Sequence, residues 1–256
     1  MSETTLDDLI ASVDLATDGD DLWARAVMLM RAEGVVTACY HHYPRPSSLA
    51  DPILFHDGWP TDLIRRYRDE GFWRMDPTHR LARRSILAVS WADVRARAEM
   101  TVDQAALMTE IEALGPVAGT AFQLPGPHLR SGAMSLGFSV PLEDLPARTM
   151  SRLLVIAQTF HIRLCALTPD LHGPAPQLSP REYEIVDQIV GGASNKAIAR
   201  ALSVSPHTID TLVRRLFGKL GVSDRTSAAI SAIGSGLVLP QDISARAKVP
   251  STDGSA

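Results

Sequence analysis

The chain has 256 residues, of which 45% are hydrophobic and 21% are charged, and its net charge is −4. This composition is typical of a globular protein and excludes the disordered and collagen-like classes. No uninterrupted apolar run approaches the roughly 20 residues that cross a bilayer, and the acidic start MSETTLDDLI lacks the basic and apolar segments of a signal peptide. We therefore expect a cytoplasmic protein with no membrane partner.

Charge and cysteine content narrow the expected partners. Residues 1–175 contain 16 Lys and Arg against 22 Asp and Glu, whereas residues 176–256 contain 9 against 7. Any contact with a polyanion is therefore expected in the C-terminal part. The two cysteines, Cys39 and Cys165, are far apart in the sequence, which favours reduced, buried thiols over a disulfide framework or a zinc knuckle.

The N-terminal part mixes strands and helices. Residues 34–43 are rich in β-formers, and residues 53–58 are expected to pair with them. Residues 60–71 begin with a proline and end with a glycine, which predicts a short helix. Residues 101–115 predict a second helix, because a threonine stands at its N-cap and a glycine follows its last turn.

Two further strands and a helix complete this part. The strands are predicted at residues 118–124 and 132–140, and a long helix with an apolar stripe is predicted at residues 145–167. Together the elements predict an α+β fold, in which an antiparallel sheet lies between helices as an α/β/α sandwich.

The second of these strands has two unlike faces. Alternation places large side chains on one face and small ones on the other. The large residues are Met134, Leu136, Phe138 and Val140, and the small ones are Ala133, Ser135, Gly137 and Ser139. The small face leaves room either for a ligand or for a closely packed helix.

A proline-rich segment divides the chain. Residues 167–177, LTPDLHGPAPQ, contain no helical period and are typical of an interdomain linker. We predict a sensor domain at residues 1–167, a linker at 168–177, a DNA-binding domain at 178–240 and a C-terminal tail at 241–256.

The C-terminal part predicts an all-α domain of four short helices. Ser179 and Glu182 have the spacing of a capping box at the start of a helix that runs to Val190. A second helix is expected at residues 195–202 and a third, with an apolar stripe, at residues 207–220. Two helices joined by a tight turn, with one face of the second left exposed, are the arrangement that enters the major groove of DNA.

Four motifs in this part carry a family resemblance. They are L-S-P-R-E from Leu178, G-x-S-N-K-x-I-A-x-x-L from Gly192, S-x-x-T-I from Ser205, and K-L-G-V-x-x-R-T from Lys219. This stretch resembles the helix-turn-helix of LuxR-type bacterial transcription regulators. The resemblance implies double-stranded DNA as a partner, and we expect a homodimer on a dyad-symmetric site because one short recognition helix reads few base pairs.

The resemblance also implies which side chains meet DNA. The base-reading positions correspond to Asp210, Thr211 and Arg214, and Arg214 has the two donors that match guanine. Asp210 departs from the basic residue usual in the family. It would be repelled by phosphate but can accept from a cytosine amino group. The candidate phosphate contacts are Lys196, Ser205, Thr208, Arg215 and Lys219.

Residues 59–91 carry a second resemblance, to the ligand-binding domain of quorum-sensing LuxR regulators. The matching residues are Pro60, Leu63, Tyr67, Asp76, Pro77 and Trp91, together with Gly119 later in the chain. The resemblance implies a pocket for an acyl-homoserine lactone. In such a pocket the Asp carboxylate accepts from the ligand amide, the Tyr hydroxyl donates to the acyl carbonyl, and the Trp packs on the lactone ring.

Our pocket candidates are therefore Trp59, Leu63, Tyr67, Asp76, Trp91 and Ser135. Core packing alone is an alternative role for Tyr67 and Trp91, and capping of a helix before Pro77 is one for Asp76. No cofactor besides a small-molecule ligand is expected.

One position departs from the family pattern. Leu63 stands where the family has the Trp whose indole N–H reads the lactone carbonyl, and leucine has no donor. Trp59, one helical turn earlier, can supply an indole N–H instead. Three alternatives follow: the lactone binds in a shifted pose, the ligand is of another kind, or the receptor has no ligand.

Other function classes fit the sequence less well. A serine hydrolase that uses Ser135 needs a strand, a sharp turn and a helix around the nucleophile, whereas Ser135 lies inside a predicted strand. His161 and Cys165 are four residues apart on a predicted helix, but two ligands do not make a metal site. A phosphorelay receiver needs an acidic cluster with a phosphoacceptor Asp, which the N-terminal half does not display. We therefore expect a regulator and not an enzyme.

Overall fold

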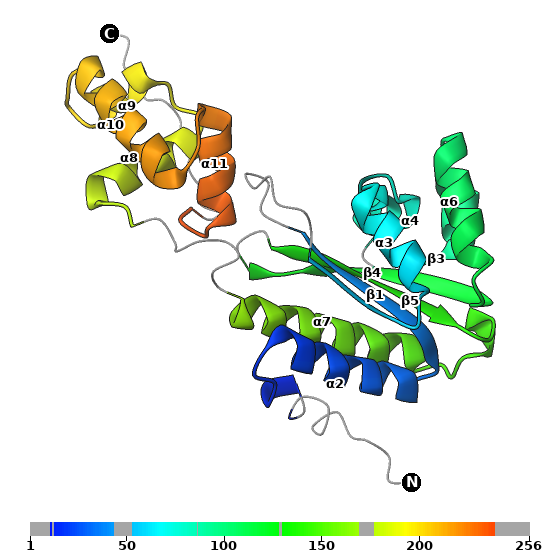
Figure 1. The fold of residues 1–256 in the computed structure, drawn as a ribbon. Helices are drawn as coiled ribbons and strands as arrows, with labels where there is room; N and C mark the ends of the chain where they lie inside the picture. Colours follow the sequence, from blue (N-terminus) through cyan, green and yellow to red (C-terminus); the bar gives the residue numbers. More distant parts are fainter. Residues whose placement is uncertain are drawn as a thin grey trace. The chain divides into compact units, whose positions relative to one another are not determined.

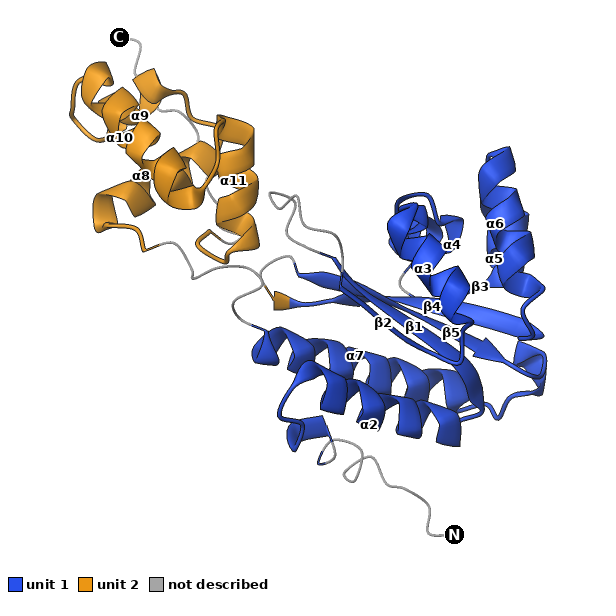
Figure 2. Ribbon diagram, in the orientation of Figure 1, with its two compact units in different colours: residues 1–43, 51–126, 130–169 blue, residues 44–50, 127–129, 170–256 orange. Residues whose placement is uncertain are grey.

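The computed structural model describes residues 11, 13–43, 53–85, 87–127, 130–168 and 177–238. The chain divides into two compact units (Figure 2). We call them the N-terminal unit, which ends at residue 169, and the C-terminal unit, whose described helices lie within residues 177–238. The predicted tail, and the predicted linker apart from its first and last residues, lie outside the described residues. The exact domain boundaries remain a prediction.

An antiparallel sheet forms the centre of the N-terminal unit. Its strands, in spatial order, are β2 (Ile53–Asp57), β1 (Val35–Tyr43), β5 (Ser131–Phe138), β4 (Ala118–Pro125) and β3 (Val89–Ser90). The predicted pairing of residues 34–43 with residues 53–58 is confirmed. In the pairing of β1 with β5, Cys39 lies opposite Ser135.

Helices cover both faces of this sheet (Figure 1). One face carries the antiparallel pair α2 (Gly19–Ala32) and α7 (Thr149–Leu167). The other carries α3 (Thr61–Asp69), α4 (Pro77–Ala82), α5 (Trp91–Arg97) and α6 (Val102–Glu112). The predicted α/β/α sandwich with an antiparallel sheet is therefore confirmed.

The two unlike faces of β5 decide where the core lies. Met134, Leu136 and Phe138 are buried in the main hydrophobic cluster, which joins the sheet to α2 and α7. The strand ends at Phe138, so the prediction that it continues to residue 140 is wrong, and Val140 is 40% exposed. Large side chains thus fill one side of the sheet, and the small side chains leave space on the other.

Helix α7 begins later than predicted. The expected start at residue 145 is wrong because Leu145 precedes Pro146 and adopts an extended conformation, so that the helix begins at Thr149. Among the described helices, α7 is long and apolar enough to cross a membrane by length and composition alone. The expectation of no uninterrupted apolar run still holds, because polar residues interrupt this helix. Eight of its residues are buried, and several of them belong to the main cluster, so it is a core helix of this unit.

The C-terminal unit contains the four predicted helices. They are α8 (Pro180–Val190), α9 (Asn195–Ala201), α10 (Pro206–Leu220) and α11 (Arg225–Gly234). The predicted capping box is present, since the Ser179 side chain accepts from the Glu182 N–H and the Glu182 side chain accepts from the Ser179 N–H. The apolar stripe of α10 packs into a second hydrophobic cluster with α8, α9 and α11.

The Glu182 carboxylate joins two helices. Besides capping α8, it accepts from the Lys219 ammonium of α10 at 2.6 Å. The Lys219 hydrogen bond and the Ser179 N–H together lower the pKa of Glu182 to about 2. The ionised carboxylate therefore stabilises the folded unit above the unfolded-state pKa near 4.5, and this stability is lost as the pH falls towards 2.

We predict that Glu182→Gln destabilises the C-terminal unit by about 1 to 3 kcal/mol at neutral pH. The difference from wild type should shrink as the pH falls below about 4.5, because protonation then removes the same charge from the wild-type protein. Calorimetry of the full chain across this range measures the difference. Glu184→Gln is the control, because Glu184 is exposed and pairs only with Arg181 in the same helix. A difference that stays constant with pH would contradict the prediction.

Candidate functional site

A small cavity lies on the side of the sheet that the small residues leave open. It has a volume of about 40 Å³, which is room for roughly three water molecules. All six pocket candidates, Trp59, Leu63, Tyr67, Asp76, Trp91 and Ser135, line it. The other residues around it are Cys39, His41, Ile64, Thr78, His79 and Ile111. The sequence predictions thus identify one site from α3, α5, β5 and the segments that precede α3 and α4. Its role in binding remains a prediction.

Gly119 allows Trp91 to lie against the sheet. A Cβ atom at Gly119 of β4 would come within 2.1 Å of the Trp91 ring, a distance that no side chain tolerates. Trp91 is the first residue of α5 and is 8% exposed. The glycine therefore permits the indole to form one wall of the cavity. This contact gives a physical reason why Trp91 and Gly119 both occur in the motif that resembles the family.

A carboxylate connects α3 to α4 beside the cavity. Asp76 caps α4 by accepting from the Thr78 N–H at 2.7 Å through Oδ1, which confirms its capping role. Its Oδ2 accepts from the Tyr67 hydroxyl at 2.6 Å. Burial, and then the charge of Asp76, raise the pKa of Tyr67 well above its ordinary value, so the phenol remains a donor. Both oxygens of this buried carboxylate are thus satisfied within the protein.

Histidines that the sequence analysis missed complete the polar lining. His79 of α4 lies 3.0 Å from Ser135 Oγ through Nε2 and 3.0 Å from the Tyr43 hydroxyl through Nδ1. His41 of β1 packs against the His79 ring, with 4.4 Å between the ring centres. Burial lowers the pKa of both histidines, so both are neutral near pH 7. The alternation of β1 was the signal that could have placed His41 on the same side as Ser135.

Two buried polar atoms of lining residues have no partner among the described residues. They are Nε1 of Trp59 and Nδ1 of His41. An indole nitrogen is always a donor, and a buried donor without an acceptor costs about 1 to 3 kcal/mol. Trp59 is the residue from which an alternative indole donor was expected. Two residues of the cavity lining, Trp59 and the neutral His41, thus each have a buried ring nitrogen that is unsatisfied among the described residues.

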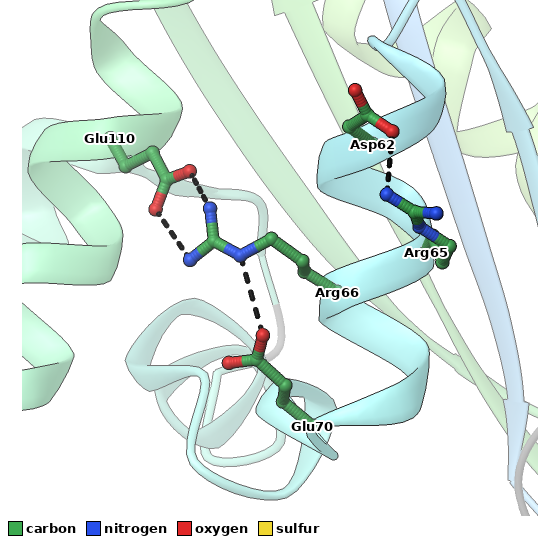
Figure 3. A network of polar contacts seen from close by, with 5 residues as sticks. All are labelled: Asp62, Arg65, Arg66, Glu70 and Glu110. Atoms are coloured by element: carbon green, nitrogen blue, oxygen red, sulfur yellow. Dashed lines mark hydrogen bonds and ion pairs between the residues drawn. The ribbon is translucent and has the colours of Figure 1, made fainter.

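A surface ion pair fastens the helices beside the cavity. Arg66 of α3 binds Glu110 of α6 through two nitrogens, at 2.5 and 3.3 Å, and contacts Glu70 at 3.4 Å (Figure 3). We call Arg66 and Glu110 the clasp. The neighbouring residues Ile64 and Ile111 line the cavity. The clasp therefore links two helices that both contribute side chains to the cavity wall.

In the C-terminal unit, α10 has one buried and one exposed face. Ile209, Val213 and Leu216 belong to the hydrophobic cluster, whereas Arg214 and Arg215 are exposed. Two nearby candidates serve the helix start, since Ser205 caps α10 and its hydroxyl lies 2.8 Å from that of Thr208. Lys196 of α9 is exposed, and Thr211 donates to the His207 carbonyl. Among the candidates, Arg214 and Arg215 thus lie on the exposed face of α10.

Two charged DNA-contact candidates, Asp210 and Lys219, bind side chains of neighbouring helices in the same unit. The Asn195 amide of α9 donates to Asp210 at 2.8 Å, and the Asn195 carbonyl oxygen accepts from Arg225 at 3.1 Å. Asp210 thus fixes α10 to α9 and α11, which gives a physical reason for an acidic residue at this position. Lys219 is paired with Glu182, so its charge is already neutralised by a carboxylate of α8.

Comparison with known proteins finds one family match in each unit of the chain. Residues 18–164 match the family described as the autoinducer binding domain, and residues 176–232 match the family described as bacterial regulatory proteins, luxR family. The putative regulator y4qH of Sinorhizobium fredii is 28% identical over 210 residues, which are 81% of this chain but only 63% of that protein. The quorum sensing-dependent regulator RpaR of Rhodopseudomonas palustris is 23% identical, with 86% of this chain and 97% of RpaR aligned.

Solved structures share the fold. SdiA of Escherichia coli superposes with a TM-score of 0.69 at 18% identity, over 90% of this chain and 96% of that chain. A structure of SdiA in complex with octanoyl-rac-glycerol gives the same TM-score at 16% identity, over 93% of this chain and 98% of that chain. The autoinducer binding domain match covers the unit with the sheet and the cavity, and the luxR match covers the unit with the exposed helix face. The chain therefore belongs to the LuxR family of bacterial transcriptional regulators with an autoinducer binding domain.

Proposed function

We propose that the cavity binds an acyl-homoserine lactone or a related acylated signal, and that the chain acts in the cytoplasm as a homodimer on dyad-symmetric DNA. The observation that carries the ligand proposal is the buried, unpartnered indole N–H of Trp59 in a cavity lined by all six candidates. A ligand carbonyl at this nitrogen would satisfy it. Trp59 then takes over the role that Leu63 cannot perform.

The rest of the cavity fits an amide or ester headgroup. Tyr67 donates and Asp76 accepts, and in the structure these two groups are bonded to each other. A ligand amide can bind Asp76 while its acyl carbonyl accepts from Tyr67, so the bond between the two residues is exchanged for two bonds to the ligand. SdiA, which has the same fold, binds an octanoyl ester of glycerol, which supports an acylated ligand without requiring a lactone ring.

The volume of the cavity requires a structural change on binding. An acylated ligand needs a pocket of about 300 Å³ or more, and about 40 Å³ is present. The walls are side chains of α3 to α6 on one side and of the sheet on the other, so we propose that the cavity widens when α3 moves away from the sheet and from α6. This step breaks the clasp.

We predict that Trp59→Phe weakens the binding of acyl-homoserine lactones about 10-fold, because one hydrogen bond is lost while the ring packing remains. Leu63→Trp should also weaken binding, since Leu63 is buried and a larger side chain overpacks the cavity. Ligand-induced thermal stabilisation of the full chain measures both effects, with octanoyl-rac-glycerol as the second probe.

Trp73→Phe is the matched control for this experiment. The Trp73 indole nitrogen is also buried without a partner among the described residues, but Trp73 does not line the cavity. Stabilisation that survives Trp59→Phe, or that improves in Leu63→Trp, would contradict the assignment of Trp59 as the donor. Lack of response to either probe in wild type would contradict the ligand proposal itself.

We predict that Arg66→Ala speeds both association and dissociation of the ligand severalfold. The pair is exposed and screened by solvent, so the melting temperature without ligand should hardly change. Stopped-flow fluorescence of the full chain measures the two rates. Arg65→Ala is the control, because Arg65 pairs with Asp62 of its own helix (Figure 3). Equal rates in the two variants would remove the clasp from ligand entry.

The proposed DNA interface is the exposed face of α10. Arg214 and Arg215 lie on it, and the dipole at the start of the helix adds to the attraction for phosphate. Because the C-terminal unit reads few base pairs by itself, two copies on inverted half-sites supply the remaining specificity. Asp210 is held by Asn195, so we propose that Arg214 carries the direct base contact.

We predict that Arg214→Ala costs about 1 to 3 kcal/mol on the preferred site and much less on a mismatched site. Arg215→Ala should weaken binding to both sites alike and reduce the slope of the salt dependence by about one. Fluorescence anisotropy on matched, mismatched and single-half-site duplexes separates these effects. Equal losses for Arg214→Ala on all duplexes, or equal affinity for full and half sites, would contradict the proposal.

The Ser135–His79 pair lacks the features of a hydrolase active site. Ser135 and His79 are within hydrogen-bond distance, but the third group is the Tyr43 hydroxyl, whose pKa is raised to about 12 chiefly by burial. A neutral phenol does not stabilise an imidazolium as a carboxylate does. Ser135 also lies inside β5 and not at a strand-to-helix turn. We propose that this pair orients a ligand, and that the chain is not an enzyme.

A further inference from the structure

A second polar cluster is buried on the opposite side of the sheet, between β1 and α7. His42 of β1, with His161 and Cys165 of α7, offers three ligand atoms that lie within 4.8 Å of one another. All three residues are at most 2% exposed. The sequence pointed only to the two helix residues, and the third ligand comes from a strand more than a hundred residues away. The ligand cavity described above uses none of these side chains.

We propose that His42, His161 and Cys165 bind one copper(I) ion. A thiolate is a soft ligand that selects copper(I) and zinc, and imidazole suits copper as well. Ligand atoms around such an ion lie about 3.5 to 3.8 Å apart, given metal bonds of about 2.0 Å to nitrogen and 2.3 Å to sulfur. His161 Nε2 and Cys165 Sγ are already 3.8 Å apart. The longest separation in the trio needs to close by about 1 Å.

Tyr40 provides the outer contacts that a metal site requires. Its hydroxyl lies 2.6 Å from His161 Nδ1 and 3.0 Å from His42 Nδ1. A histidine that ligates a metal usually donates its other ring N–H to an oxygen, which fixes the tautomer and the ring orientation. With Nδ1 of His161 protonated towards the phenol, Nε2 has a lone pair and faces Cys165. One phenol oxygen thus orients both imidazoles.

The protonation states agree with this role. Burial lowers the pKa of His42 and of His161 to about 4, so both rings are neutral near pH 7. Burial raises the pKa of the Cys165 thiol, although Arg130 opposes this shift, so the thiol keeps its proton until an ion displaces it. Binding forms the Sγ–copper bond and releases the thiol proton to solvent, with no change in oxidation state.

Arg130 decides between a monovalent and a divalent ion. Its guanidinium is buried beside the cluster, donates to the Cys165 carbonyl and contributes to lowering the pKa of His42. One thiolate and copper(I) sum to zero charge, whereas one thiolate and zinc leave a positive charge next to this guanidinium. Such like-charge contacts are costly in a buried site. The charge balance therefore favours copper(I).

Gly126 keeps the metal-facing side of His161 accessible. A Cβ atom at Gly126 would lie 2.5 Å from His161 Nε2, closer than any real contact. A side chain at this position would therefore collide with the ligand nitrogen. Gly126, which directly follows β4, thus lies next to the imidazole without a side chain.

The test is a copper(I) titration of the full-length protein under anaerobic, reducing conditions, in competition with a chromophoric copper(I) chelator. We expect one equivalent per chain, and X-ray absorption that shows one sulfur and two nitrogen neighbours. Cys165→Ser should lower the affinity by about 100-fold or more, and Tyr40→Phe by about 10-fold, because Tyr40→Phe keeps all three ligands and removes only their orientation. Cys39→Ser is the control, since Cys39 lines the cavity on the other side of the sheet.

Three results would overturn the proposal: equal affinity in wild type and Cys165→Ser, an absorption spectrum without a sulfur neighbour, or tighter binding of zinc than of copper(I). If Cys165→Ser fails to fold, Tyr40→Phe still decides, because unchanged affinity in a folded Tyr40→Phe protein also contradicts the site. The test does not involve the acylated ligand, so its outcome is independent of the proposed function.

Discussion

The N-terminal unit depends on one constraint: its central strands, β1 and β5, are buried on both faces. A strand with two buried faces must divide its side chains between two interiors. β5 meets this requirement with large residues towards α2 and α7 and small residues towards the cavity. β1 meets it with polar residues on both faces, because His41 and His42 are each 2% exposed. Since buried polar groups need partners, Tyr40 contacts His42 and His161 on one side of the sheet, and Tyr43 contacts His79 on the other.

This division separates the two sides of the sheet chemically. The side towards α7 is close-packed, and its one polar cluster is held together by Tyr40. The other side has a thinner wall, made of short helices that are joined by the Tyr67–Asp76 bond and by the exposed clasp. We therefore expect the wall of short helices to be the side that opens for a ligand, while α2 and α7 hold the main hydrophobic cluster together.

Much of this architecture could be predicted from sequence, and the exceptions have identifiable reasons. The strands, α3, α6 and the C-terminal helices follow from alternation, capping residues and apolar stripes. Helix α2 was missed although it has an Asp18 N-cap and an apolar stripe through Leu22, Ala26 and Leu29, which are signals present in the sequence. The short elements β3, α4 and α5 are too brief for periodicity to detect.

The sites divide in the same way. Four of the six cavity residues were found through a family resemblance, Trp59 through its place one turn before Leu63, and Ser135 through the small face of its strand. His41 and His79 depend instead on strand pairing and on the placement of α4. The cluster of His42, His161 and Cys165 could not be assembled from sequence, because it needs the contact between β1 and α7. The ion pair of Lys219 with Glu182, and the bond of Asp210 to Asn195, likewise appear only when α8, α9 and α10 are packed together.

The four buried imidazoles have a consequence for the conditions under which this receptor works. Burial lowers the pKa of His41, His42, His79 and His161, so all four are neutral near pH 7, and His42 and His161, with pKa values of about 4, stay neutral in mildly acidic conditions. Histidine is the side chain by which proteins most often sense acidity, and here it is placed where protons have almost no effect. If the cavity binds a signal as proposed, its two imidazoles would then add little pH dependence to that binding near neutrality.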